Sequence, residues 1–160
     1  MTDSLKSLLI IAHTPSENTQ KMAKAILTGA QNKEIHRVKT RLISPFDCDS
    51  ETVLASDSLI LFTTENFGYM SGALKDFFDR VYYPCLNDPK RNEAKPFSLI
   101  IRAGLDGTGA DQSVQTITNG LNWRQAQAST ICKGTYNQRF EHSGHQLGLT
   151  IAASLEAGII

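Results

Sequence analysis

Short apolar runs alternate with helix-like segments along nearly the whole chain, and this order limits the possible folds more than any other feature. The runs at 8–12 and 59–62 are continuously apolar, and the run at 97–101 is apolar except for Ser98, which is typical of strands buried on both faces. Each is followed by a polar or glycine-containing stretch and then by apolar residues at helical spacing. Such strands need helices on both sides, so the pattern predicts an α/β protein with a parallel sheet.

Two further strands complete the predicted sheet. Residues 35–43 are less apolar and suit a sheet edge, and residues 126–132 form the most polar of the expected strands. Helical faces are expected around 22–30, 74–82, 114–121 and 147–155, with Gly158 as the final stop. We therefore predict a three-layer α/β/α sandwich with a five-stranded parallel sheet in the order 2-1-3-4-5 and right-handed crossovers. No linker interrupts the series, so residues 1–160 are expected to form a single domain.

Composition excludes several classes of partner. A chain of 160 residues with 41% hydrophobic residues can bury one core. Its 16 basic and 16 acidic residues cancel, so no overall field favours nucleic acid or an anionic membrane. The apolar run before His13 is too short for a signal core or a membrane span, and we expect a cytoplasmic protein. The cysteines, Cys48, Cys85 and Cys132, are odd in number and widely spaced, which favours reduced thiols over disulfides or zinc ligands.

Ligands in such sheets bind beyond the carboxyl ends of the strands, where the strand order reverses. The loops expected at that edge are 13–19, 63–72, 103–111 and 134–143, together with the turn Ser44-Pro45-Phe46. The charged segment 84–95 follows a helix and should lie at the opposite edge, with its basic residues in solvent.

The first of these loops, HTPSENT at 13–19, can bind an anion without lysine or arginine. It brings three hydroxyl groups, an amide and the free N–H groups of a helix start to one place. The same residue types also cap helices, so the loop alone fits either role. It lacks the glycine and lysine pattern of a nucleoside-triphosphate loop and the G-x-G-x-x-G pattern of a dinucleotide site. It also lacks the acidic residues that a phosphorylated receiver domain needs after its first strand.

The other two loops suit a flat ligand. Segment AGLDGTGAD at 103–111 is rich in glycine, which lets a backbone approach a ligand closely and present N–H groups. Segment TTENFGYMSG at 63–72 places aromatic and glycine residues between a buried strand and a strongly amphipathic helix. In the predicted strand order these loops flank the phosphate-type loop. One phosphate pocket beside two backbone walls indicates a planar, phosphorylated cofactor.

The sequence resembles the flavodoxin-fold flavoproteins, in particular the small NAD(P)H-dependent FMN reductases and quinone reductases. The resemblance covers almost the whole chain and rests on HTPSENTQKMA as the phosphate loop, TTENFGYMSGALKDFFDR as the isoalloxazine loop and helix, and AGLDGTGA as a second flavin wall. It implies the following cofactor-binding residues: Thr14, Ser16, Asn18 and Thr19 at the FMN phosphate; Thr64, Glu65, Asn66, Phe67, Gly68 and Tyr69 along the ring; and Gly104, Asp106, Gly107, Thr108 and Gly109 at its pyrimidine side.

One position departs from this family. Glu17 stands where flavodoxins commonly have a glycine, and a glutamate beside a dianionic phosphate weakens binding unless its side chain points to solvent.

The resemblance implies an FMN-dependent NAD(P)H oxidoreductase that reduces quinones, flavins or similar small acceptors, with NADH or NADPH as donor. The flavin carries that chemistry, so no catalytic side chain or metal is expected. Two alternatives remain: a flavodoxin-type single-electron carrier, which the zero net charge disfavours, and a non-catalytic module with weak FMN binding. The resemblance also implies a homodimer.

Polar residues near the C-terminus allow more than one interpretation. Glu141, His142 and His145 are spaced as metal ligands on one helical face, although an exposed helix start explains them more simply. Alternatively Tyr136, Arg139 and His142 contact a substrate or the nicotinamide cofactor's phosphate, because the loop after the fifth strand lies at the ligand edge.

Overall fold

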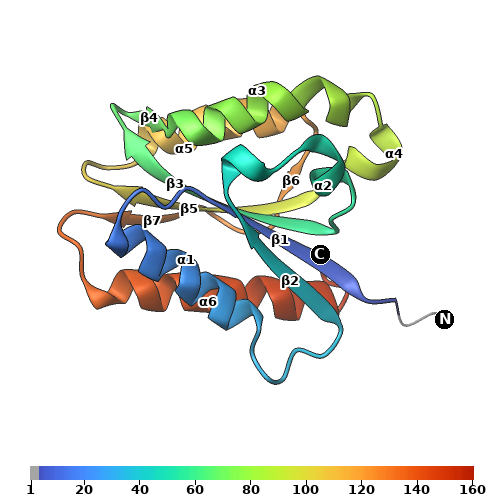
Figure 1. Cartoon of the computed structure of the whole chain (residues 1–160), viewed down its shortest axis with the longest axis horizontal. Helices are drawn as coiled ribbons and strands as arrows, with labels where there is room; N and C mark the ends of the chain where they lie inside the picture. The colour runs from blue at the N-terminus through green and yellow to red at the C-terminus, as the bar shows by residue number, and fades with distance from the viewer. Residues whose placement is uncertain (1–3) are drawn as a thin grey trace.

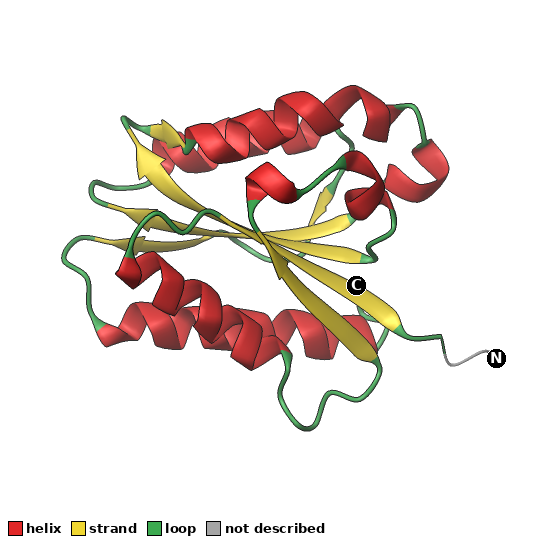
Figure 2. Ribbon diagram, viewed as in Figure 1, coloured by secondary structure: helices red, strands yellow, loops and turns green. Residues whose placement is uncertain are grey.

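The computed structural model describes residues 4–160 and shows a twisted sheet between two layers of helices (Figures 1 and 2). The strands are β1 (Lys6–Ala12), β2 (Val38–Ile43), β3 (Ser58–Asn66), β4 (Tyr69–Met70), β5 (Pro96–Ala103), β6 (Arg124–Gln125) and β7 (Thr130–Lys133). The helices are α1 (Glu17–Ala30), α2 (Ser50–Leu54), α3 (Gly72–Leu86), α4 (Pro89–Asn92), α5 (Thr108–Gly120) and α6 (Gln138–Glu156), with a 3₁₀ turn η1 at Pro45–Asp47. Among the residues described, no helix is both long and apolar enough to cross a membrane.

The sheet has the predicted topology. Its order is β2-β1-β3-β5-β6, and β7 also pairs with β5, all of these pairs being parallel. The predicted fourth strand corresponds to β5, and the predicted fifth strand, at 126–132, overlaps β7 and begins directly after β6. The register aligns Leu9 with Leu59 and Leu61 with Leu99 across the three central strands. The prediction of a flavodoxin-like order 2-1-3-4-5 is therefore confirmed.

Each central strand contributes to two cores, one on each side of the sheet. Leu9 and Leu61 face the layer of α2, α3 and α5, whereas Ile10 and Ile60 face α1 and α6. All four side chains are at most 2% exposed. Successive residues of a strand point to opposite faces, so burial on both faces requires a continuous apolar run.

Helices α1 and α6 pack backbone to backbone. A Cβ added at Gly29 would lie 2.0 Å from the carbonyl oxygen of His145, and one added at Gly148 would lie 2.0 Å from that of Ile26. Side chains at these positions would therefore separate the two helices. Three residues of α1 beyond this contact, Met22, Ala23 and Ile26, are buried against the sheet.

The predicted fifth strand is broken. Residues 126–129 are not part of a strand and form a bend between β6 and β7, although the Ala126 N–H still donates to the Phe97 carbonyl oxygen of β5 at 2.8 Å. Side chains hold this bend: Gln125 Nε2 donates to Ser129 Oγ at 3.0 Å, and Ser129 Oγ donates to Asp111 Oδ1 at 2.7 Å. Polar side chains made the predicted strand at 126–132 the most polar of the five, and one of them, Ser129, stabilises the bend that interrupts it.

Segment 84–95 differs from a purely solvated loop. Helix α3 continues through Pro84 to Leu86, and α4 follows. Lys90 is exposed, but Lys95 is 5% exposed and its Nζ donates to the carbonyl oxygen of Ser56, so the expectation of a solvated side chain was wrong for Lys95. Burial lowers the pKa of Lys95. The ammonium group closes the end of α2, a site that favours positive charge.

Trp123 follows α5 and packs in the core. Its ring lies against Phe78 and Phe97, and its Nε1 donates to Asn92 Oδ1 at 2.7 Å. This bond satisfies the only polar atom of the buried indole.

The contact between α1 and α6 predicts an unusual response to alanine. Alanine is favoured over glycine inside a helix by about 1 kcal/mol, yet overpacking costs about 1–3 kcal/mol. Gly148→Ala should therefore lower the free energy of unfolding, measured by urea denaturation. Gly72→Ala is the matched control because a Cβ there meets nothing within 4 Å. Equal stabilities of the two variants would contradict the packing described for α1 and α6.

Candidate functional site

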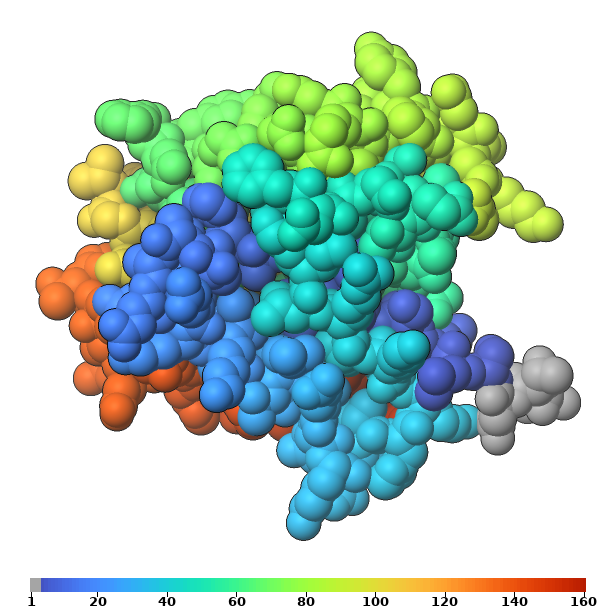
Figure 3. Space-filling model, viewed as in Figure 1, coloured from blue at the N-terminus to red at the C-terminus, as the bar shows by residue number. Residues whose placement is uncertain are grey.

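Four segments lie together at the carboxyl edge of the sheet. They are the start of α1, the β3–β4 hairpin, the loop after β5 and the loop after β7. Along the left edge of the space-filling view they form one continuous surface, coloured blue, green, yellow and orange (Figure 3). The structure therefore brings the three predicted flavin segments to one place.

The first loop is organised by a capping box. Ser16 Oγ accepts from the Thr19 N–H at 3.2 Å, and Thr19 Oγ1 accepts from the Ser16 N–H at 3.0 Å. Thr19 is 3% exposed, so it lies beneath the surface of the loop. Within residues 4–160 the N–H groups of Glu17 and Asn18 have no acceptor and remain available to an anion. Thr14 is half-buried and Asn18 is exposed beside them.

Glu17 does not face this anion position. Its side chain is 83% exposed and pairs with Lys21 one turn further along α1, with Oε1 3.3 Å from Nζ. The lysine offsets part of the negative charge. Burial lowers the pKa of His13, so this residue adds no positive charge to the loop at neutral pH.

The β3–β4 hairpin turns on Phe67 and Gly68. Their φ angles are 53° and 70°, the pattern of a type I′ turn, in which asparagine-glycine is preferred. Phe67 is therefore strained as well as fully exposed, at 107% of its reference area. A Cβ added at Gly109 would lie 1.9 Å from the Gly68 carbonyl oxygen, so the start of α5 touches the turn.

Glu65 ties the hairpin to the loop after β5. Its Oε1 accepts from the Leu105 N–H at 2.9 Å, and its Oε2 accepts from the Gly107 N–H at 2.7 Å. Two of the backbone donors expected to face a ligand are thus used inside the protein. The N–H of Asp106, between them, has no acceptor in another residue among 4–160, and it lies toward its own carboxylate. Gly104 is exposed, and a side chain there would meet nothing within 4 Å.

Asp106 shapes the entry to α5. Its Oδ1 accepts from the Thr108 N–H at 3.1 Å and from Thr108 Oγ1 at 2.9 Å. These bonds lower the pKa of Asp106. The carboxylate is therefore ionised at neutral pH and adds negative charge to this wall.

A buried hydrogen-bond network supports the hairpin. Thr63 Oγ1 accepts from the Ser71 N–H at 3.0 Å, and Ser113 Oγ accepts from the Met70 N–H at 3.1 Å. Ser71 also caps α3 through the Leu74 N–H at 3.2 Å. The sequence interpretation did not assign Thr63, Ser71 or Ser113. A serine directly before a helical stripe was the available signal for Ser71.

The sequence interpretation also missed Arg102. Its guanidinium donates to three carbonyl oxygens, those of Ala103 at 2.6 Å, Cys132 at 3.2 Å and Gly134 at 2.7 Å. It also lies over the Phe140 ring, 5.0 Å from the centroid. Among residues 4–160 it has no carboxylate partner. The Arg102 guanidinium therefore connects the loops after β5 and β7. The sequence feature that could have identified this residue was an arginine directly after an apolar run.

The remaining candidates give no metal centre. Residues 4–160 contain no group of three or more histidine, cysteine, aspartate or glutamate side chains placed to hold a metal ion. The three cysteines are free and buried, as expected for reduced thiols. Burial raises the pKa of Cys85 and of Cys132 to about 11. Glu141 is engaged with Tyr136, whose hydroxyl donates to Oε2 at 2.8 Å.

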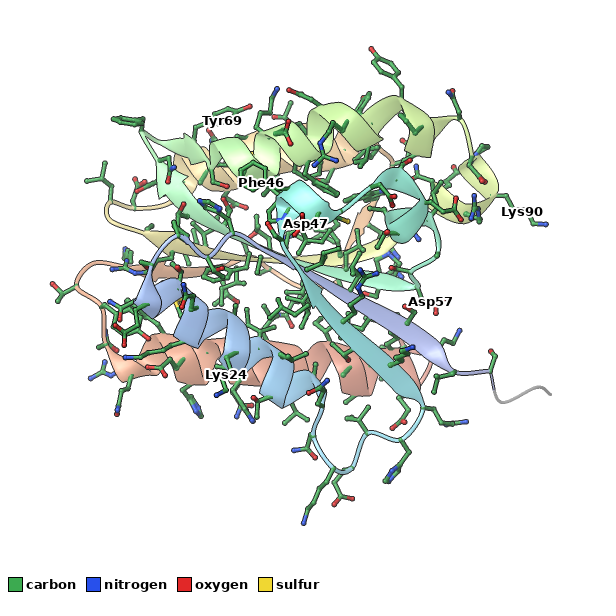
Figure 4. All side chains as sticks on the ribbon, in the orientation of Figure 1. Lys24, Phe46, Asp47, Asp57, Tyr69 and Lys90 are labelled. Carbon is green, nitrogen blue, oxygen red and sulfur yellow. The ribbon has the colours of Figure 1, made fainter. Side chains whose placement is uncertain are left out.

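The turn after β2 also reaches this edge. Arg80 of α3 donates to the carbonyl oxygens of Pro45 and Cys48, which holds the turn against α3. Phe46 and Tyr69 are 63% and 42% exposed, and both are labelled in Figure 4. Aromatic side chains therefore border the site on two segments.

Comparison with known structures defines the class of fold as flavodoxin-like. A flavodoxin from the domain Archaea superimposes with a TM-score of 0.77 at 16% identity, covering 94% of this chain and 99% of the other. A WrbA-like flavodoxin from Agrobacterium tumefaciens gives 0.74 at 15% identity, covering 97% and 99%. An NADH:FMN oxidoreductase, EmoB, in its apo form gives 0.70 at 16% identity, covering 93% and 89%.

Sequence comparison adds one partial match. A flavodoxin from Aquifex aeolicus (strain VF5) is 34% identical over 74 residues, which are 46% of this chain. The match spans 39% of that flavodoxin's length. No protein-family model matches the sequence.

Removing the Glu65 carboxylate should loosen the second wall. Glu65→Ala leaves the Leu105 and Gly107 N–H groups without their acceptor, so their amide hydrogen exchange should accelerate by about tenfold or more, the loss of about 1.4 kcal/mol. Exchange measured by NMR tests this, with Asp76→Ala in exposed α3 as control. Unchanged protection at both amides would contradict the role assigned to Glu65.

Relieving the turn strain should stabilise the fold. Phe67→Asn places a residue that tolerates positive φ at the first turn position, and the exposed phenyl ring loses no packing. We expect the free energy of unfolding to rise by about 1 kcal/mol in chemical denaturation. Phe67→Leu removes the ring and keeps the strain, so it should show no such gain. A Phe67→Asn variant that is less stable than the wild type would contradict the conclusion that the backbone is strained at Phe67.

Proposed function

We propose that this protein binds FMN at the carboxyl edge of its sheet and acts as an NAD(P)H-dependent oxidoreductase on quinones, flavins or similar small acceptors. The observation that carries the proposal is the position of the α1 start beside the ends of β3 and β5. The start of α1, with two free N–H groups suited to a phosphate, thus lies beside the β3–β4 hairpin and the loop after β5, which present backbone groups.

The residues present fit FMN. Thr14, Asn18 and the first N–H groups of α1 suit the phosphate, with Ser16 and Thr19 holding the loop in shape. Glu17 points away with Lys21, which removes the main objection to a dianion there. This argues against the alternative of a module that has lost its cofactor.

The hairpin and the loop after β5 form the walls proposed for the ring. Segment 64–69 and segment 104–109 are fixed to one another by Glu65 and by the contact of Gly68 with Gly109. Fixed walls bind a planar ring with little ordering cost.

When bound, FMN would supply the hydride and electron-transfer chemistry of such a reaction. The protein's share is binding, orientation and electrostatics. Backbone N–H groups at this wall favour negative charge near the pyrimidine side, and the Asp106 and Glu65 carboxylates oppose it. Arg102 contributes a positive charge that no carboxylate of the described chain neutralises at close range. This balance sets the flavin potential.

A flavodoxin-type electron carrier is the second candidate. The partial identity to the Aquifex aeolicus flavodoxin favours it. Against it stands the zero formal net charge, since carriers use net charge to steer toward oppositely charged partners. A homodimer whose partner closes the acceptor pocket forms part of the oxidoreductase proposal.

Flavin titration tests the cofactor. The purified chain should take up FMN, with the visible spectrum and quenched fluorescence of bound flavin. Thr14→Ala and Asn18→Ala should each weaken FMN binding by about tenfold, equivalent to one lost hydrogen bond to a charged group. Riboflavin, which lacks the phosphate, should bind wild type and variants alike. A protein that takes up no flavin would rule out both candidates.

Anaerobic stopped-flow mixing with NADH and NADPH separates the two candidates. An oxidoreductase should bleach its flavin rapidly with one or both nicotinamides. A single-electron carrier should show no rapid hydride transfer. The same preparation followed with a quinone then identifies acceptor turnover.

A further inference from the structure

A groove between α1 and α6 is lined mainly by basic side chains. Its volume is about 520 Å³, and its lining residues are Lys21, Lys24, Ala25 and Thr28 from α1 with Glu141, His142 and His145 from α6. It begins at Lys21 in the second turn of α1 and at Glu141 in the first turn of α6, and both helices start at the carboxyl edge of the sheet. The groove therefore opens beside the proposed flavin site.

The walls of this groove are fixed. Gly29 and Gly148 hold the two helix backbones in contact, so the lining side chains stand on helices that cannot close or separate without disturbing that contact. Lys21, Lys24 and Thr28 follow one stripe of α1 at helical spacing. A preformed groove loses little free energy in ordering when a ligand binds.

The basic side chains of the groove are largely unpaired. The side chains of Lys24, His142 and His145 make no hydrogen bond or ion pair with residues 4–160, and the Lys21 side chain pairs only with the exposed Glu17. The groove's acidic member, Glu141, accepts from the Tyr136 hydroxyl. Burial and this bond raise the pKa of Tyr136 to about 12, so the tyrosine stays a neutral donor. An anion would meet two ammonium groups and two imidazole rings.

We infer that this groove binds the extra phosphate of NADPH and so gives the protein a preference for NADPH over NADH. This inference rests on the proposed function. Lys24 lies seven residues beyond the start of α1, roughly 10 Å along the helix axis from the proposed FMN phosphate position. A dinucleotide with its nicotinamide at the flavin can extend its adenosine end over that distance. The phosphate monoester is the only group that distinguishes the two donors.

Binding of the oxidised nucleotides tests the inference without turnover. Isothermal titration of NADP⁺ and NAD⁺ into the full chain, with and without added FMN, should show NADP⁺ binding about tenfold or more tightly. Adenosine 2′-phosphate should compete with NADP⁺, and inorganic phosphate should compete only weakly. Equal affinities for NADP⁺ and NAD⁺ would overturn the inference.

Charge-matched variants locate the site. Lys24→Ala and the double variant Lys24→Ala/His142→Ala should reduce NADP⁺ affinity toward that of NAD⁺ and leave NAD⁺ affinity unchanged. Lys90→Ala removes the same charge from α4, away from α1 (Figure 4), and should have no effect. An equal loss in the Lys90 and Lys24 variants would show nonspecific attraction and overturn the inference.

The two proposals fail in different ways. NADP⁺ preference in a chain that takes up no FMN would leave the groove standing and remove the oxidoreductase. FMN binding with no NADP⁺ preference, or with a preference insensitive to Lys24, would leave the cofactor site standing and remove the groove.

Discussion

Burial of β1, β3 and β5 on both faces is the constraint on which the rest of the molecule depends. A strand between two apolar cores accommodates few polar side chains along its length, because an unpaired buried polar group costs free energy. Ser98 of β5 is such an exception, since its hydroxyl is buried and has no hydrogen-bond partner among residues 4–160. Most of the polar groups available for chemistry therefore lie at the strand ends. At the carboxyl ends the chain places the start of α1, the β3–β4 hairpin and the glycine-rich loop, and these form the candidate site.

Fixed charges at that edge are held by backbone groups rather than by opposite charges. Glu65 is bound by two N–H groups, and Arg102 is bound by three carbonyl oxygens. Each charge thus stabilises a loop and keeps its electrostatic effect, since no counter-ion cancels it nearby. In the proposed oxidoreductase, this arrangement places opposite charges on neighbouring strands around the flavin.

The sequence predicted the features that depend on local pattern. The apolar run at 59–62 identified a doubly buried strand, and the hydroxyl and amide residues of 13–19 indicated polar groups at a helix start. Features that depend on distant partners were not predictable. Lys95 is buried because the Ser56 carbonyl accepts its ammonium group, and the fifth strand breaks because Ser129 reaches Asp111. Neither pairing leaves a trace in the neighbouring sequence. The glutamate in the TTENFG segment was assigned to the site, but its two backbone partners lie 40 and 42 residues away.

The glycine contact between α1 and α6 also fixes the rotation of each helix about its own axis. Gly148 meets Ile26 and Gly29 meets His145, so the two helices touch at two points and can neither slide nor roll independently. One inserted residue turns the following part of a helix by about 100°. The parts of α1 and α6 between their first residues and these contacts therefore tolerate substitution on their outer faces but no insertion or deletion. The number of residues in these parts determines where each helix start lies at the ligand edge.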